Sequence, residues 1–320
     1  MERMEIDIQG ISETNLNTNQ YKTRRSLQAS AMKADSSVTT VWSTSDTEST
    51  TTFKPGGTGL IARPPITDRI LQKGRDNLGR YTYLIIDTKG PPILLMNIYQ
   101  CCIRPTNLEG NSAYCQQQIL LSQEGRTNIN PRTNFYIDVN NFIHKFINDH
   151  PGGRMIIMGD WNELCTGNST SSKLCRNHNL VDLWDFHHPN TTFRTYQRGR
   201  HRIDFALVSF TLAPLMDPVY EPFQYRLKGD HRAMIIQFDS RKVFGSTNGQ
   251  LQSRKRRLLL SKDKKAVHTY ITNLHQHLLQ HNIFKRANNL IASVITNNEE
   301  AECILSLIHI WRCRRRLRCR

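Results

Sequence analysis

Four short segments of the sequence carry polar groups that could act together on a phosphate ester. They are Ser12-Glu13-Thr14-Asn15, Gly159-Asp160-Trp161-Asn162, Arg202-Ile203-Asp204 and Gly229-Asp230-His231-Arg232. Each segment lies beside an apolar run that is typical of a buried strand. Buried carboxylates are rare unless they are paired or hold a metal ion. Several of them at strand ends, with one histidine among them, predict a hard-metal site that cleaves phosphate esters.

The residue types suggest a different task for each of these side chains. Asp160 can activate or orient a water, and the neutral amide of Asn162 can hold that water or a phosphate oxygen. His231 can donate a hydrogen bond or proton to the developing charge, with Asp204 as the carboxylate that orients it. Glu13 has no basic residue nearby in the sequence, so we expect it to bind Mg²⁺. The structural alternative at Asp160 is a common Asp-Asn turn after a strand.

Two further residues extend this candidate site. Asp230 precedes His231 directly and is a second candidate metal ligand. Tyr99 ends an apolar run, where its hydroxyl could donate a hydrogen bond to a phosphate oxygen. A lone tyrosine at a strand end is also commonly structural, so both readings of Tyr99 stay open.

The apolar patterns predict the elements that would position these groups. Alternation over residues 4–11 predicts an edge strand that leads directly into Glu13. Asn130-Pro131 opens a helix in which apolar residues recur every three to four positions. Further strands are expected at residues 38–42, 81–86, 93–99, 155–158, 204–208 and 233–238, the second and third forming a hairpin. Many strands with few helices between them predict an α/β fold of sheets packed face to face and flanked by helices.

The positive charge of the chain is concentrated near its C-terminus. The net charge is +16, but residues 1–240 hold 26 Lys and Arg against 23 Asp and Glu, whereas residues 241–320 hold 17 against 4. A basic extension favours contact with a phosphate backbone whatever the base sequence. A solvated tail is the other interpretation. Within this extension, the apolar spacing over residues 267–294 predicts two amphipathic helices.

The eight cysteines do not form a metal-binding or disulfide pattern. No pair has the Cys-x-x-Cys spacing, so we expect free thiols. Cys165, Cys175 and His178 are an alternative set of three zinc ligands for which the sequence fixes no fourth. No apolar run approaches the roughly 20 residues that cross a bilayer, so no membrane association is expected.

Taken together, residues 5–240 resemble the endonuclease/exonuclease/phosphatase superfamily. The resemblance rests on the order of Glu13, a Gly-Gly turn, a strand ending in Tyr99, Gly-Asp-x-Asn, Arg-Ile-Asp and Asp-His. It implies a four-layer α/β sandwich of two packed mixed β-sheets with outer helices. It also implies that Glu13 binds the metal, that Tyr99 and Asn162 contact the phosphate, that Asp160 handles the nucleophilic water, and that Asp204 supports His231.

Within that superfamily, residues 11–16 and 97–99 look most like the endonuclease domain of non-long-terminal-repeat retrotransposons. This resemblance implies an endonuclease that nicks target DNA with Mg²⁺ or Mn²⁺. It also implies an intracellular protein that is in the nucleus when it acts on DNA. The full-length polyprotein would then also carry a reverse transcriptase. The alternatives are a repair-type abasic-site nuclease, a small-molecule phosphodiesterase of the same superfamily, or an inactive fragment that only binds nucleic acid.

The resemblance divides the chain into three parts and brings two notable departures. We expect the nuclease domain at residues 1–240, without the family's first strand, and a basic linker with helices at residues 241–304. Residues 305–320 resemble translated sequencing adapter, which implies an artefactual tail without specific function. The second departure follows Tyr99, where Gln100-Cys101-Cys102 replaces the usual Pro and phosphate-contacting Asn.

Overall fold

The structure is a computed structural model that describes residues 6–34, 37–103, 110–126, 130–224, 229–245 and 264–292. The chain divides into two compact units, Met1–Ser253 and Arg254–Arg320. Helix α6 (Ser240–Phe244) belongs to the first unit, because Val243 and Phe244 are buried in its core.

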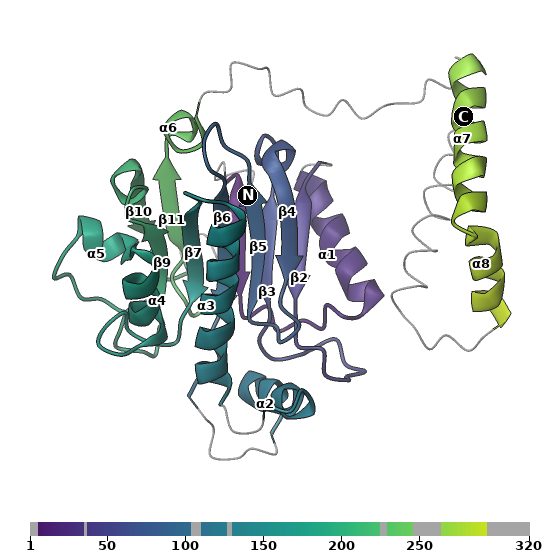
Figure 1. Cartoon of the computed structure of the whole chain (residues 1–320). Helices are drawn as coiled ribbons and strands as arrows, with labels where there is room; N and C mark the ends of the chain where they lie inside the picture. The colour runs from purple at the N-terminus through teal and green to yellow at the C-terminus, as the bar shows by residue number, and fades with distance from the viewer. Residues whose placement is uncertain are drawn as a thin grey trace. The chain divides into compact units, whose positions relative to one another are not determined.

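A six-stranded mixed sheet is the centre of the first unit (Figure 1). Its strands, in spatial order, are β4 (Ile70–Arg75), β5 (Tyr81–Ile86), β6 (Ile93–Tyr99), β7 (Arg154–Asp160), β9 (Asp204–Ser209) and β8 (Leu180–Asp182). Strands β6 and β7 run parallel, and the other neighbouring pairs are antiparallel. The predicted hairpin and the predicted strands after it are confirmed.

Two smaller antiparallel sheets form the layer that faces this sheet. One has the order β1 (Ile8–Ser12), β3 (Thr58–Ala62), β2 (Thr39–Ser43), and the other pairs β10 (Met216–Tyr220) with β11 (Met234–Phe238). The predicted packing of sheets with flanking helices is confirmed, but only the six-stranded sheet is mixed. Strand β1 ends its sheet, as the sequence predicted, and β11 ends the other.

Side chains alternate between two cores on the faces of the six-stranded sheet. On β6, Ile93 and Leu95 pack toward the small sheets, whereas Leu94 and Met96 pack toward the helices. The helical side is covered by α3 (Pro131–Asp149) and α4 (Thr170–His178). Because both faces are buried, the strands are continuously apolar rather than alternating in polarity.

Five helices in the described part of the first unit were not predicted from the sequence. They are α4 and α6, already given, and α1 (Tyr21–Ala34), α2 (Ala113–Gln123) and α5 (Leu183–His187). Helix α1 contacts β2, and Thr40 donates a hydrogen bond of 2.5 Å from Oγ1 to Oε1 of Gln28 on that helix. The first unit therefore has helices against both sheet layers, as the predicted four-layer sandwich requires.

The second unit contains the two helices expected from the apolar spacing. They are α7 (Lys264–Gln280) and α8 (Ile283–Ala292), which contact each other and bury Ile283. The basic run at residues 254–257 and the adapter-like tail at 305–320 lie outside the described residues. Within the described part of the chain, no helix has the length and apolar character that crossing a membrane demands.

Candidate active site

Three of the candidate residues form one row across the six-stranded sheet. Tyr99 at the end of β6 is the register partner of Asp160 at the end of β7, and Asp160 is the partner of Asp204 at the start of β9. Because side chains alternate along a strand, these residues share the face that Ile93, Leu95 and the neighbouring core residues use. All three side chains therefore lie on the side of the two small sheets.

The row depends on a close approach of β6 and β7 at Gly159. A Cβ atom at Gly159 would lie 2.1 Å from the carbonyl oxygen of Ile98, and its φ of +143° is rarely adopted by residues with a side chain. Position 159 therefore requires a glycine. Without a side chain there, β7 can pair closely with β6 up to Asp160, whose carboxylate then lies at the end of the strand.

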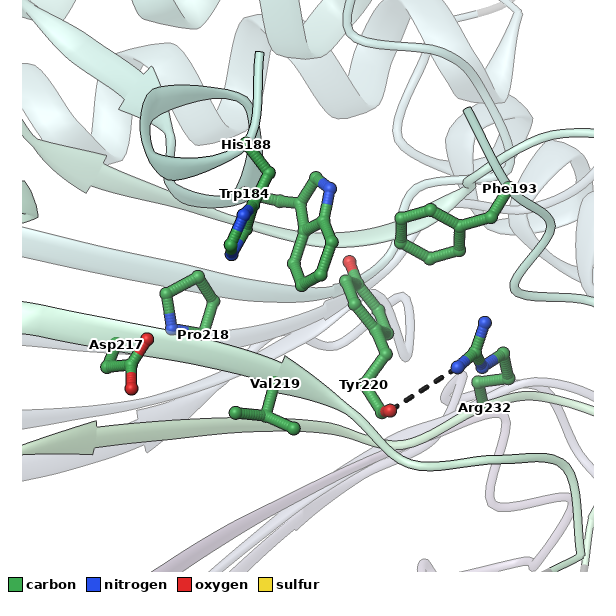
Figure 2. Close-up of a pocket in the computed structure, with 8 residues that line it drawn as sticks. All are labelled: Trp184, His188, Phe193, Asp217, Pro218, Val219, Tyr220 and Arg232. Atoms are coloured by element: carbon green, nitrogen blue, oxygen red, sulfur yellow. Dashed lines mark hydrogen bonds between the residues drawn. The ribbon is translucent and has the colours of Figure 1, made fainter. Parts of the chain in front are cut away.

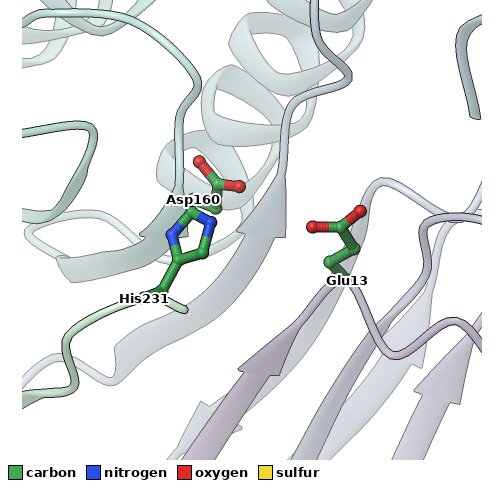
Figure 3. Close-up of side chains that lie close together, drawn as sticks. All are labelled: Glu13, Asp160 and His231. Atoms are coloured by element: carbon green, nitrogen blue, oxygen red, sulfur yellow. The ribbon is translucent and has the colours of Figure 1, made fainter. Parts of the chain in front are cut away.

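The facing layer supplies the other two candidate residues. Glu13 follows β1, and His231 lies just before β11. Ligand atoms of Glu13, Asp160 and His231 all lie within 4.8 Å of one another, and their side chains converge in Figure 3. The structure therefore brings together three predicted site residues that are separated by up to more than two hundred positions in the sequence.

His231 and Asp204 form a hydrogen-bonded pair. The Nδ1 atom of His231 lies 2.8 Å from Oδ2 and 3.1 Å from Oδ1 of Asp204. Burial alone would lower the pKa of His231, but the hydrogen bond to Asp204 and the charge of that carboxylate outweigh burial and raise the pKa to about 9. The pairing occupies Nδ1 and leaves Nε2 to act on another group.

Asp160 is buried and is held by its neighbour Asn162. The backbone N–H of Asn162 donates to Oδ1 of Asp160, and its Nδ2 donates to Oδ2, both at 3.0 Å. The same amide also donates to the carbonyl oxygen of Gln100 at 2.8 Å. Burial, followed by the charge of Asp204, raises the pKa of Asp160 to about 8, although His231 opposes this shift. The carboxyl group therefore has a strong affinity for a proton or a cation.

Glu13 is held in an unusual backbone conformation. Its φ is +53°, and that of Asn15 is +54°, a region that few residues other than glycine adopt. The backbone N–H groups of Thr14 and Asn15 donate to the carbonyls of Gly57 and Gly56, so the Gly-Gly turn supports this bend. Burial raises the pKa of Glu13, whereas the charge of His231 lowers it.

The remaining candidates lie at the border of this group. Tyr99 is buried, and burial followed by the charge of Glu13 raises the pKa of its hydroxyl, so it stays protonated as a donor. Asp230 is exposed, and its carboxylate is not part of the close group that Glu13, Asp160 and His231 form among the described residues. Its backbone carbonyl accepts a hydrogen bond from the N–H of Gln197.

Ser12 connects the two layers beneath the site, a role that the sequence analysis did not assign. Its Oγ donates to the carbonyl oxygen of Ile98 at 2.7 Å and accepts from the backbone N–H of Asp160 at 3.4 Å. Ser12 thus ties the strand that carries Glu13 to the two strands that carry Tyr99 and Asp160. Its position directly before Glu13 was the one available signal.

A second set of residues that was missed lies behind Asn162. Arg132 donates from Nη1 to the carbonyl oxygen of Cys101 at 2.6 Å and pairs with Glu163 at 3.0 Å. Glu163 also accepts from Nε2 of Gln100 and from the backbone N–H of Ser171. This network joins the loops after β6 and β7. No local pattern could have revealed it, because its members come from separate parts of the chain.

The donor set at the site fits a hard divalent cation. The carboxylates of Glu13 and Asp160 approach the same point beside the ring of His231, and carboxylate oxygens suit Mg²⁺ or Mn²⁺. A cation would also relieve the cost of burying the carboxylate of Asp160 beside Asp204. The chemistry of these residues therefore agrees with a metal site at the place the sequence predicted.

The alternative zinc set is not assembled. Nε2 of His178 lies 3.0 Å from Oδ1 of Asn140, and its ring packs edge-to-face on His144. The sulfur atoms of Cys165 and Cys175 lie 3.9 Å apart. Among the described residues, the three do not form a metal-binding group. The five cysteines within the described ranges are free thiols, as expected.

These features agree with the family to which the sequence is matched. Residues 7–219 match the Endonuclease/Exonuclease/phosphatase family, and the chain belongs to this family. The family comprises hydrolytic nucleases and phosphatases that generally depend on a divalent metal. No curated protein matches the sequence.

Solved structures with the same fold include an AP endonuclease from Leishmania major. It is 15% identical with a TM-score of 0.51, and the match covers 73% of this chain and 78% of that chain. The catalytic domain of APE2 from Xenopus laevis is 16% identical with a TM-score of 0.47, covering 74% and 85%. A 3′ phosphatase from Neisseria, bound to a product DNA hairpin, is 17% identical with a TM-score of 0.45, covering 73% and 89%. At these identities the likeness concerns the fold alone.

Proposed function

We propose that this protein is a metal-dependent endonuclease that hydrolyses phosphodiester bonds in DNA, of the kind encoded by non-long-terminal-repeat retrotransposons. The observation that carries the proposal is the convergence of Glu13, Asp160 and His231, with Asp204 bonded to His231. Family membership supports the hydrolytic class. The wording of residues 11–16 and 97–99 supports the retroelement type.

In the proposed reaction, Glu13 with Asp160 would hold a Mg²⁺ or Mn²⁺ ion, which would neutralise charge on the scissile phosphate. Asp230, the second ligand predicted from the sequence, lies outside this close group and has no part in the step. Asp160, in the ionised form that a neighbouring cation would favour, accepts the proton of the attacking water. Asn162 holds that water or a phosphate oxygen. His231 is protonated below about pH 9 and donates from Nε2 to the charge that develops on the phosphate.

Two further groups would bind the phosphate or steady the site. The Tyr99 hydroxyl donates a hydrogen bond to a phosphate oxygen, because its raised pKa keeps the proton in place. Asp204 holds the imidazolium of His231 in position through Nδ1. The basic residues of 241–320 would contact the DNA backbone without reading base sequence.

The retroelement assignment also implies a setting for this activity. The protein would act on DNA in the nucleus. A reverse transcriptase domain is expected in the full-length polyprotein.

Nicking of supercoiled plasmid in Mg²⁺ tests the proposal directly. His231→Ala should lower the nicking rate by at least about 100-fold, in line with the loss of a group that acts on transition-state charge. DNA binding measured by fluorescence anisotropy should change little, because affinity comes from Lys and Arg. His144→Ala, an exposed histidine outside the site, is the matched control.

The same assay separates the alternatives. Cleavage confined to oligonucleotides that contain an abasic site would indicate a repair-type nuclease. DNA binding without cleavage of any substrate, in either Mg²⁺ or Mn²⁺, would indicate an inactive binding fragment. Wild-type nicking rates in His231→Ala would refute the assigned mechanism.

A further inference from the structure

A cavity of about 520 Å³ lies in the first unit next to the candidate active site. Its walls come from α5, from the segment before β9, from β10 and from the residue after His231. Eight residues line it, as Figure 2 shows: Trp184, His188, Phe193, Asp217, Pro218, Val219, Tyr220 and Arg232. None of these residues has a place in the reaction described above, so the cavity needs its own explanation.

Three aromatic rings form a fixed apolar surface in this cavity. The ring centroids of Trp184 and Phe193 are 5.0 Å apart, those of Trp184 and Tyr220 are 5.0 Å apart, and those of Phe193 and Tyr220 are 4.9 Å apart. All three pairs meet edge to face, an arrangement that holds each ring against the next. Nε1 of Trp184 donates to Oγ1 of Thr191 at 2.7 Å, which fixes the indole further.

The guanidinium of Arg232 adds a cation to this surface. Its Nε donates to the carbonyl oxygen of Glu221 at 2.9 Å, and Nη2 donates to that of Tyr220 at 3.3 Å. The group lies 5.2 Å from the centroid of Phe193, in cation–π contact. Because main-chain carbonyls position it, the guanidinium is oriented before any ligand arrives. Fixed aromatic rings with an oriented cation are the features that bind nucleobases in single strands.

The cavity is joined to the active site by covalent and hydrogen-bonded contacts. Tyr220 donates from its hydroxyl to the backbone carbonyl of Asp204 at 2.5 Å. Arg232 follows His231 in the chain, and the ring of Tyr196 packs against that of His231 at a tilt of 31°, with centroids 4.8 Å apart. The lining of the cavity and the candidate active site therefore share neighbouring residues on the main chain.

We propose that this cavity binds a nucleobase that is unstacked from the DNA strand held at the active site. The inference rests on the proposed function, since it needs a nucleic acid strand at His231. The aromatic rings take up the face of the base, and Arg232 supplies a cation beside it. Because stacking on an aromatic surface tolerates any base, the cavity contributes affinity rather than sequence preference.

The test compares the binding of two single strands that share a phosphate backbone. One is an octathymidylate, and the other is an eight-residue strand of abasic tetrahydrofuran units. Binding of each to the full chain is measured by fluorescence anisotropy in EDTA. The wild-type protein should bind the strand with bases about 5- to 150-fold more tightly, which corresponds to stacking of one base.

Two pairs of variants locate this preference in the cavity. Val219→Trp fills the cavity from an exposed strand position, and Val219→Thr is its matched control because the residues have a similar shape. Trp184→Ala removes one ring, and Phe186→Ala removes an exposed ring from the same helix outside the cavity. The preference for bases should disappear in Val219→Trp and Trp184→Ala and persist in both controls.

Two results would overturn the inference. One is equal binding of both strands by the wild type, and the other is an unchanged base preference in Val219→Trp and Trp184→Ala. Plasmid nicking by the wild type, measured in parallel, reports on the proposed function separately. If the protein nicks plasmid but shows no base preference that depends on the cavity, only the proposed binding of a base is refuted. If the preference is present but nicking is absent, the nuclease assignment is refuted and the cavity remains a nucleic-acid-binding site.

Discussion

Replacement of Asp160 by Asn should stabilise the metal-free protein at neutral and alkaline pH. Asp160 is only 4% exposed, and burial together with the charge of Asp204 raises its pKa to about 8. The folded chain without metal thus pays to ionise a carboxylate that the unfolded chain ionises freely. An amide of the same shape has no charge to bury.

The size of this effect follows from the pKa shift. An ordinary Asp has a pKa of 3.8, so at pH 7 the unfolded chain has released this proton while the folded chain keeps it. The difference lowers the free energy of unfolding by about 4 kcal/mol. The amide of Asp160→Asn would offer one oxygen where the carboxylate accepts two hydrogen bonds from Asn162, and leaving one donor unpaired costs about 1–3 kcal/mol. The net gain is about 1–3 kcal/mol, which raises Tm by about 2–4 °C per kcal/mol.

The pH dependence identifies the cause. Because the folded pKa is raised, the folded state holds a proton on Asp160 that the unfolded state has released between about pH 4 and pH 8. The stability that this proton confers is complete below pH 3.8 and is lost as the pH rises through 8. The advantage of Asp160→Asn over the wild type should therefore be near zero at pH 5 and largest at pH 8.

Urea denaturation at pH 5, 7 and 8 in EDTA measures this difference, with Asp87→Asn, an exposed carboxylate of the β5–β6 hairpin, as the control. Addition of Mg²⁺ should then stabilise the wild type more than Asp160→Asn, since the variant lacks a carboxylate ligand. A variant that is less stable than the wild type by the same amount at every pH would refute the reasoning. It would mean that Asp160 is a structural hydrogen-bond acceptor rather than a charge held for a cation.

Two further predictions concern groups outside the active site. Burial, followed by the charge of His144, lowers the pKa of His178 to about 4. The unfolded state therefore takes up a proton between pH 7 and pH 5 that the folded state does not, and the wild type should lose about 2 kcal/mol of stability over this range. Urea denaturation at the two pH values should show a smaller loss for His178→Gln. Arg80 is buried between Asp76 and Asp138 at 2.7 and 2.6 Å, so Arg80→Met should cost about 3–5 kcal/mol in urea denaturation, and a cost below about 1 kcal/mol would contradict the inferred role.

The sequence was sufficient to predict the elements that are buried on both faces. Strands β6, β7 and β9 form continuous apolar runs, and such runs leave few alternatives to a central strand. Helix α3 was predictable because Asn130-Pro131 is a common helix start. In the structure Asn130 caps the helix by accepting a hydrogen bond from the N–H of Thr133. The convergence of the site was predictable because its residues flank these same strands.

The elements that the sequence did not reveal are those with mixed or polar faces. Strand β4 exposes three consecutive residues of its six, so it shows no regular alternation, and β10 contains Pro218 within the strand. Helices α1 and α2 lack a regular apolar stripe. The division of the second layer into two antiparallel sheets was also missed, since pairing between distant strands leaves no local trace.

The site depends on how the two layers are held together, because neither layer contains all of it. The six-stranded sheet carries Asp160 and Asp204, and the edges of the two small sheets carry Glu13 and His231. Asn97 fixes this arrangement by donating from Nδ2 to the carbonyls of Ile11 and Gly59. A Cβ atom at Gly10 would lie 2.5 Å from Oδ1 of the same amide, so β1 can approach β6 only through a glycine. The buried polar contacts between the layers therefore set how closely Glu13 and His231 approach Asp160 and Asp204.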